Sequence, residues 1–382
     1  MNYENLFRPG YIGGLRIKNR VVMTAMGNGL AAENGEASDE IIACYKARAA
    51  GGCGLLITEF CAVDGENGIA ETHQLQIHAP RFIKRLALLT DTLHRYDCKV
   101  FFQLFHPGRE GKPQFNGGRQ VISASGIVNP ATGRVSHEMT REEIHGMVDK
   151  FVTGAVYAQQ ANADGVELHC AHGYLLHQFL SPHSNVRTDE YGGSAENRAR
   201  FAAEAVSAVH AAVPGMPIDY KLAVRQENPH FGNAGVVEEE LSVFVPLLEQ
   251  AGVTSFHVTL ANHSALENTI PPADHPYFSQ PGCFLKFCDE VRQYTDLPIC
   301  GVGGLNDPDL VEQQLASGRI QCAAMSRQLL ADPDWVNKLK NGQAEQIHRC
   351  LRCNKKCLGG LMAHQGTRCV YDALREKEAK NA

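Results

Sequence analysis

Short apolar runs rich in β-branched and aromatic residues recur along the whole chain, and segments of helical character separate them. Near-continuous apolar strands that alternate with amphipathic helices are typical of a parallel sheet covered on its outside. Eight such units close a (β/α)8 TIM barrel, so we expect this α/β fold. The eight expected strands are residues 21–26, 54–60, 99–105, 165–170, 217–223, 255–261, 298–304 and 322–327.

Helix-start and loop signals agree with this pattern. Thr140 and Glu143 have capping-box spacing at the start of a helix expected over residues 140–163. Asp307 supplies a capping side chain directly before Pro308, whose missing N–H costs little in a first helical turn. Long segments rich in Gly, Pro and Ser follow the third and sixth strands. Because loops after barrel strands line the active-site face, we expect these two loops to cover a substrate.

Composition narrows the class of function. The 382 residues include 44% apolar and 20% charged residues, enough for a large core. The formal charge of -6 provides no basic field, which argues against nucleic-acid binding and favours small-molecule chemistry. The opening residues contain no signal-peptide apolar region, and no apolar run approaches the ~20 residues that cross a bilayer. We therefore expect a cytoplasmic protein without membrane association.

Four of the thirteen cysteines gather near the end of the sequence, and the others are scattered and are interpreted as ordinary buried thiols. Four thiolates can wrap one metal centre, and both zinc and iron-sulfur clusters use such sites. Structural zinc sites usually pair two CxxC knuckles, whereas only one occurs here, so the spacing favours iron-sulfur over zinc or free thiols. We expect a barrel over residues 1–342 and a cluster segment with a tail over residues 343–382. The four cysteines are Cys350, Cys353, Cys357 and Cys369.

Two further groups of residues follow expected strands. His169, His172 and Tyr174 come at the end of the fourth strand, where imidazoles can polarise a carbonyl oxygen and a phenol can donate a proton. A buried polar cluster is the alternative, and three such residues at a barrel mouth argue against it. The run GVGGLNDP after the seventh strand, together with Arg327 after the eighth, has the composition of an anion cradle, although a simple tight turn also explains the glycines.

Four stretches together resemble one family. They are LRIKNRVVMTAM (15–26), FFQLFHPGR (101–109), the run DGVELHCAHGYLLHQFLSPHSNVRTDEYGGSAENRARF (164–201) and the C-terminal cysteine spacing. The sequence resembles the Old Yellow Enzyme group of FMN-dependent ene-reductases, most closely its 2,4-dienoyl-CoA reductase branch, which carries a 4Fe-4S cluster. This resemblance spans nearly the whole chain.

The resemblance implies a flavin site. Lys221 stands where the family commonly has arginine, which retains a positive charge but replaces a planar fork with a point charge. Gln103 is expected to hydrogen-bond the isoalloxazine ring, and Phe60 to lie near it. The other residues implied are Thr24, Ala25, Met26 and Gly27 along the flavin, and Gly303, Gly304, Ser326 and Arg327 around its phosphate.

The resemblance also implies a reaction, the reduction of an activated C=C bond in an unsaturated carbonyl substrate. Tyr174 is then the proton donor to the α-carbon, while reduced FMN delivers hydride to the β-carbon. His169 and His172 match the pair that binds the carbonyl oxygen in simple ene-reductases. His263 matches a histidine that assists the tyrosine in dienoyl-CoA reductases, so the site combines features of both.

The hypotheses about function differ mainly in the source of the electrons that reduce the flavin. Long dienoyl-CoA reductases continue into FAD- and NAD(P)H-binding domains, whereas no GxGxxG fingerprint occurs in these 382 residues. We therefore expect a separate reductase or ferredoxin to supply electrons through the cluster. The alternatives are direct reduction by NAD(P)H with a cluster outside the route, amine oxidation on the same fold, and a flavin-free barrel with structural zinc acting as a lyase or binding protein.

Overall fold

The computed structural model describes residues 2–224, 227–228, 232–233, 238–260 and 266–381. Eight parallel strands form a closed barrel in the order β12-β13-β14-β3-β4-β5-β8-β9, and β9 pairs with β12 to close the ring. This confirms the expected TIM barrel. The barrel strands are β3 (Val21–Met23), β4 (Leu55–Ala62), β5 (Lys99–Phe105), β8 (Gly165–Cys170), β9 (Ile218–Ala223), β12 (Ser255–Thr259), β13 (Ile299–Gly301) and β14 (Cys322–Met325).

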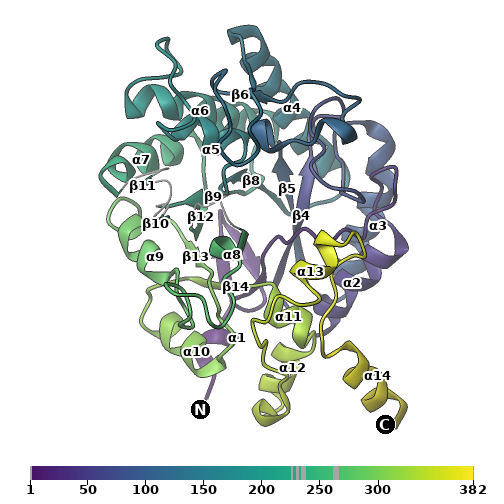
Figure 1. The fold of residues 1–382 in the computed structure, drawn as a ribbon. Helices are drawn as coiled ribbons and strands as arrows, with labels where there is room; N and C mark the ends of the chain where they lie inside the picture. Colours follow the sequence, from purple (N-terminus) through teal and green to yellow (C-terminus); the bar gives the residue numbers. More distant parts are fainter. Residues whose placement is uncertain (1, 225–226, 229–231, 234–237, 261–265, 382) are drawn as a thin grey trace.

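Helices surround this barrel, and the main apolar core lies between them and the outer faces of the strands (Figure 1). Their starts follow the expected capping: Thr140 and Glu143 form a reciprocal capping box, and the Asp307 side chain accepts a hydrogen bond from the Asp309 N–H. The surrounding helices are α2 (Asp39–Ala50), α3 (Ile83–His94), α4 (Arg141–Gln160), α6 (Ala195–Ala212), α7 (Leu241–Ala251), α9 (Leu285–Arg292), α10 (Pro308–Ala316), α11 (Arg327–Ala331) and α12 (Trp335–Lys340). In the described part of the chain, no helix is both long and apolar enough to cross a bilayer.

The inside of the barrel has an apolar half and a polar half. The apolar half packs Phe101, Ile57 and their neighbours against Ile12 and Ile17 of an N-terminal hairpin, β1 (Gly10–Ile12) and β2 (Leu15–Ile17). This hairpin was not among the expected elements. Because the apolar half is closed in this way, the polar half at the carboxyl ends of the strands is the half that opens into a pocket.

Four expected strands end earlier than their apolar runs. The first ends at Met23, so residues 24–26 leave the ladder, and the sixth, seventh and eighth end at Thr259, Gly301 and Met325. After the first, seventh and eighth strands, the reason is that the next residues turn into loops that line the pocket. The remaining short elements are α1 (Glu4–Phe7), α5 (Leu175–Leu180), α8 (Leu266–Thr269), α13 (Leu358–Met362), α14 (Asp372–Asn381), β6 (Ile122–Ser123), β7 (His137–Glu138), β10 (Glu227–Asn228) and β11 (Gly232–Asn233).

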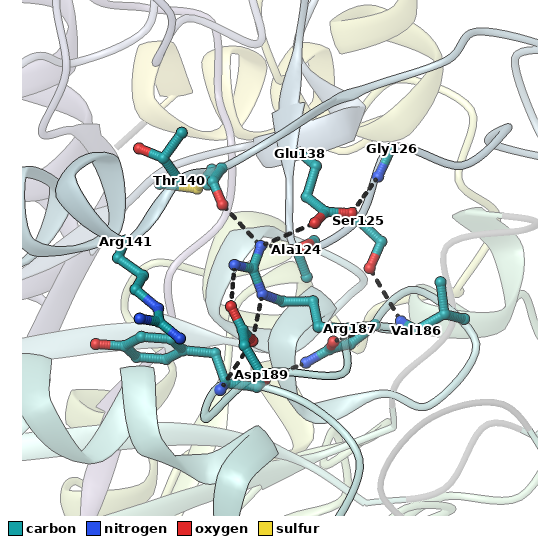
Figure 2. A network of polar contacts seen from close by, with 12 residues as sticks. Ala124, Ser125, Gly126, Glu138, Thr140, Arg141, Val186, Arg187 and Asp189 are labelled. Atoms are coloured by element: carbon teal, nitrogen blue, oxygen red, sulfur yellow. Dashed lines mark hydrogen bonds and ion pairs between the residues drawn. The ribbon is translucent and has the colours of Figure 1, made fainter.

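The long segment after β5 is more ordered than the loop that its composition predicts, because β6 and β7 pair within it. Arg187, which follows α5, anchors this segment by donating hydrogen bonds to the backbone oxygens of Ala124, at 2.9 Å, and Met139, at 2.7 Å (Figure 2). Asp189 accepts two hydrogen bonds from the same guanidinium, at 2.9 and 2.6 Å. The bidentate pair with Asp189 fixes the orientation of the Arg187 guanidinium. Arg187 therefore holds the segment after β5 and the segment after α5 together beside the barrel mouth.

Candidate active site

One large pocket opens at the carboxyl ends of the barrel strands, with an empty volume of about 1450 Å³. This volume includes space that is open to solvent. His263 lies outside the described residues. The other expected flavin and catalytic residues all line this pocket: Thr24, Ala25, Met26, Gly27, Phe60, Gln103, His169, His172, Tyr174, Lys221, Gly303, Gly304, Ser326 and Arg327.

Phe60 reaches the pocket through an irregularity in β4. The pairing of β4 with β5 shifts between Ile57 and Phe60, which is a β-bulge. Phe60 then packs so closely over Gly27 that a Cβ atom there would lie 2.7 Å from its ring. The bulge also leaves Glu59 buried behind the wall, where its carboxylate accepts hydrogen bonds from the Asn28 N–H at 2.7 Å and the Leu75 N–H at 3.0 Å. Glu59 therefore holds the loop after β3 in place.

The three residues that follow β8 form one aromatic group at the mouth. The Tyr174 ring lies 4.9 Å from the His169 ring and 6.5 Å from the His172 ring, centroid to centroid. A left-handed turn at His172, with φ of 57°, and Gly173, with φ of 77°, returns the chain so that Tyr174 faces the barrel axis. Phe105 packs edge-on against Tyr174 at 4.6 Å. The phenol is thus held by rings on two strands.

The protonation states of this group follow from its contacts. Burial raises the pKa of Tyr174, and the negative charges of Glu71 and Glu110 raise it further, so the phenol keeps its proton at neutral pH. The Ala171 N–H donates to Nδ1 of His169 at 3.3 Å. In the neutral imidazole this leaves the proton on Nε2, which makes His169 a hydrogen-bond donor from that atom.

The polar half of the barrel interior lies directly below. Glu167 accepts hydrogen bonds from Gln103 and, at 2.7 Å, from Nδ1 of His257, while Ser255 donates to Asp219. Because a carboxylate takes the amide N–H of Gln103, the amide oxygen of Gln103 is left to accept from a pocket ligand. All five side chains are buried.

Lys221 completes this network. It lies beside His169 on one strand and His257 on the other, and its ammonium donates to Thr24 Oγ1 at 3.1 Å. Burial alone raises the pKa of Glu167, but the charges of Lys221 and His257 more than reverse this and hold it below its ordinary value. Burial and the neighbouring Glu167 charge raise the pKa of Asp219, so Asp219 keeps its proton more readily than Glu167 does.

Glu167, Asp219 and His257 also bring three possible metal-ligand atoms within 4.8 Å of one another. A cation there would stand beside the buried Lys221 ammonium, which opposes it. The hydrogen bonds already described satisfy the carboxylates instead. We interpret the group as a charge-balanced network under the pocket floor.

The opposite end of the pocket has the features of an anion cradle. Gly303 and Gly304 have φ of 118° and 64°, and a Cβ atom on Gly303 would lie 2.9 Å from Phe284. Arg327 lines the same end and donates to the Pro271 oxygen at 3.1 Å and to Asn354 Oδ1 at 2.7 Å. Burial lowers the pKa of Arg327, and a desolvated guanidinium attracts an anion strongly. These residues fit the phosphate of a flavin nucleotide.

The cysteine segment forms part of the pocket wall. Cys350 and Cys357 line the pocket, whereas Cys353 and Cys369 are not among its described lining residues. The Arg352 N–H donates to the Cys350 sulfur at 3.4 Å, a contact of the kind that tunes thiolate ligands. Arg352 has φ of 52°, which curls the loop between the first two cysteines.

The spacing of the four sulfur atoms bears on the choice between metals. Among the described residues, no three of these sulfurs lie within 4.8 Å of one another. Zinc bonds of about 2.3 Å in a tetrahedron hold sulfurs about 3.8 Å apart. The described sulfurs are therefore not arranged as a closed tetrahedral zinc site.

Sequence reasoning missed Arg352. Its guanidinium lies in the pocket wall next to Gly304 and donates to the backbone oxygens of Phe278 and, at 2.5 Å, Ser279. Its position between two cysteines is the only signal in the sequence, and that position indicates a metal site alone. The network of Glu167, Asp219 and His257 was missed as well, because inward-facing acids on neighbouring strands become visible only through their register.

Comparison with known protein families agrees with this geometry. Residues 5–346 match the NADH:flavin oxidoreductase / NADH oxidase family. The chain belongs to this family. The match confirms the resemblance to the Old Yellow Enzyme group and shows an FMN-dependent oxidoreductase fold.

Individual relatives differ in length. The chain is 42% identical over 381 residues to a bilirubin reductase of Clostridium symbiosum, covering 98% of this chain and 99% of that one. It is 35% identical to an NADH oxidase of Thermoanaerobacter brockii, covering 99% of this chain and 57% of that protein. A solved 2-naphthoyl-CoA reductase complex superposes with a TM-score of 0.87 at 28% identity, covering 96% of this chain and 56% of the other. The chain therefore spans about half the length of the last two.

Proposed function

We propose that this oxidoreductase is an ene-reductase that reduces an activated C=C bond of an unsaturated carbonyl compound. The observation that carries the proposal is the buried, protonated Tyr174 beside His169 at the mouth of a pocket whose floor and far end fit FMN. Relatives named as reductases of bilirubin and of 2-naphthoyl-CoA support it.

The residues that would hold FMN divide into two sets. Gln103, Thr24 and Lys221 face the ring from the floor, and the Gln103 amide oxygen is available to accept from a ring N–H. Gly303, Gly304, Ser326 and Arg327 take the phosphate. When bound, FMN supplies the hydride for the β-carbon of the alkene.

Tyr174 supplies the proton. Its raised pKa keeps the phenol protonated through the neutral range, and a proton donated to the α-carbon completes the saturated product. His169 donates from Nε2 to the carbonyl oxygen and His172 lies 5.2 Å away, ring to ring, as the second member of the pair. Hydrogen bonds to that oxygen stabilise the negative charge that develops there.

The four cysteines hold a 4Fe-4S cluster in this proposal. Because Cys350 and Cys357 line the flavin pocket itself, these thiols would hold the cluster at the wall of that pocket. When bound, such a cluster would supply one-electron chemistry, so a separate donor protein would deliver two electrons for each C=C bond. In the alternative, NAD(P)H would reduce FMN directly and the cluster would take no part in electron transfer. The relative named NADH oxidase supports this alternative.

The reaction is tested by its isotope pattern. Enzyme reduced anaerobically with dithionite is mixed in D2O with 2-cyclohexenone and with cinnamate, and the products are examined by NMR. The proposal predicts a saturated product with deuterium at the α-carbon. Absence of a saturated product from a panel of enones, acids and thioesters, in protein shown to contain FMN, would reject the ene-reductase assignment.

The electron route needs a separate test. Flavin bleaching is followed after rapid mixing with NADH, NADPH or a reduced one-electron carrier, in the wild type and in Cys353→Ser. The relay predicts fast bleaching by the carrier alone and its loss in the variant. If NADH bleaches the flavin quickly, and equally in the wild type and in Cys353→Ser, NAD(P)H reduces FMN directly and the alternative holds.

A further inference from the structure

The four-cysteine site has an inner and an outer side. All four cysteines are half-buried, but Cys350 and Cys357 line the flavin pocket, whereas Cys353 and Cys369 are not among its described lining residues. Electrons that arrive from outside the protein therefore meet Cys353 and Cys369 first. The surface around these two thiols is where a donor would have to dock.

That surface is basic. Residues 347–371 contain five Lys and Arg residues and no Asp or Glu, in a chain whose formal charge is -6; Arg352 among them is buried, and Asp372, directly after this stretch, accepts a hydrogen bond from the Cys369 N–H at 2.9 Å. Lys355 and Lys356, which lie between Cys353 and Cys357 in the sequence, are exposed, and neither forms an ion pair within the described residues. Arg368, directly before Cys369, is 59% exposed and pairs with Glu40 at 2.9 Å. The free charge next to the outer thiols is thus mainly that of the two lysines.

An apolar side chain completes the surface. Leu351 is 56% exposed, although it belongs to the same tight loop as Cys350 and Cys353. Interfaces commonly surround an apolar centre with a charged rim, and electron-transfer encounters are small, below about 1200 Å². A loop with one exposed leucine and two exposed lysines fits an interface of this size.

We propose that Lys355, Lys356 and Leu351 form the docking surface for a small acidic one-electron carrier protein. This inference rests on the proposed function, because it assumes a cluster on the four cysteines. Each docking event oxidises one carrier by one electron, so two carriers are oxidised for each C=C bond. Two protons from water, one of them through Tyr174, balance the reduction to CH–CH.

Charge complementarity favours this occupant over the others. Opposite charge raises the rate of encounter and makes it sensitive to salt, since exposed charges are screened beyond ~10 Å at about 0.1 M. A basic carrier is repelled by the lysines. A second copy of this chain that docked through the same surface would bring its own two exposed lysines to the contact.

The experiment compares two doubly substituted proteins with equal charge change. Lys355→Glu/Lys356→Glu alters the docking surface, and Lys84→Glu/Arg119→Glu alters exposed positions on α3 and in the loop after β5. The probes are a purified two-cluster bacterial ferredoxin, which is acidic, and cytochrome c, which is basic. Binding to immobilised enzyme is measured from about 0.01 M to about 0.15 M salt, with iron content and reduction by dithionite recorded for each protein.

The proposal predicts that ferredoxin binds the wild type and the control double variant, and binds the lysine variant at least about tenfold more weakly at low salt. Dithionite reduces all three proteins alike, because it needs no docking surface. Equal ferredoxin binding by the lysine variant, or cytochrome c binding as tight as that of ferredoxin, overturns the docking surface and leaves the proposed function standing. Self-association that the lysine substitutions abolish also overturns it, in favour of a second copy. Absence of iron from all three proteins rejects the cluster and the docking surface together.

Discussion

Gly303 offers the sharpest test of the phosphate end of the pocket. Its φ of 118° lies in a region that only glycine adopts easily, and an added Cβ atom would stand 2.9 Å from both the Phe284 backbone nitrogen and its ring carbon. In Gly303→Ala the loop must shift or bear a backbone strain of about 1–3 kcal/mol. If FMN binds only to the native conformation of the loop, the free energy of this strain is subtracted from the binding free energy. Binding then weakens by roughly 5- to 150-fold, at about 1.4 kcal/mol per tenfold.

The assay is titration of flavin-free protein with FMN and, separately, with riboflavin, followed by quenching of flavin fluorescence. Because riboflavin has no phosphate, the substitution should weaken FMN binding far more than riboflavin binding. Gly318→Ala is the matched control: its φ is 74°, and nothing lies within 4 Å of its added Cβ atom. It should lower the unfolding free energy by about 1 kcal/mol and leave FMN affinity unchanged. FMN binding by folded Gly303→Ala within twofold of the wild type would refute the assignment of this loop to the phosphate.

Three further predictions concern buried charge and the cluster. Glu167→Gln removes the negative charge facing Lys221, so we expect a loss of about 3–5 kcal/mol in urea unfolding and a more positive flavin reduction potential; an unchanged potential contradicts the charge-balance interpretation. Burial raises the pKa of Glu59 to about 7 from 4.5, so its contribution to stability is complete below pH 4.5 and is lost as the pH rises through 7. The loss in unfolding free energy is about 3 kcal/mol. Urea unfolding of wild type and Glu59→Gln at pH 5 and pH 8 measures it, and a difference between the two proteins that does not change with pH would contradict this prediction. Cys357→Ser should lose most iron and acid-labile sulfide, and full retention of both excludes Cys357 as a ligand.

Periodicity and spacing were enough to predict the barrel and the elements that form its mouth. The strands β5 and β8 are buried on both faces, and such strands have near-continuous apolar sequences. This apolar run is visible in the sequence and predicts a strand of a covered parallel sheet. The capping box at Thr140 is likewise local, because both partners lie within four residues. Such features depend on the chain within a few residues and can be read from it directly.

The features that could not be predicted depend on contacts across the fold. Arg352 reaches oxygens of residues 271, 278 and 279, which are more than seventy positions away in sequence. Glu167 and Asp219 are ordinary strand residues until the register sets them side by side. Phe60 enters the pocket because of a bulge for which the apolar run gives no sign. Which residues line the mouth was predictable, whereas the network that holds them was not.

The most direct test of the central claim is the oxidative half-reaction of Tyr174→Phe. Wild type and variant, each with FMN bound and reduced anaerobically, are mixed rapidly with 2-cyclohexenone, and flavin reoxidation is followed together with formation of the saturated ketone. Loss of the general acid predicts that the variant keeps its flavin spectrum and slows by ~10²- to 10⁴-fold. Reoxidation of both proteins at the same rate, with the same saturated product, would contradict the account.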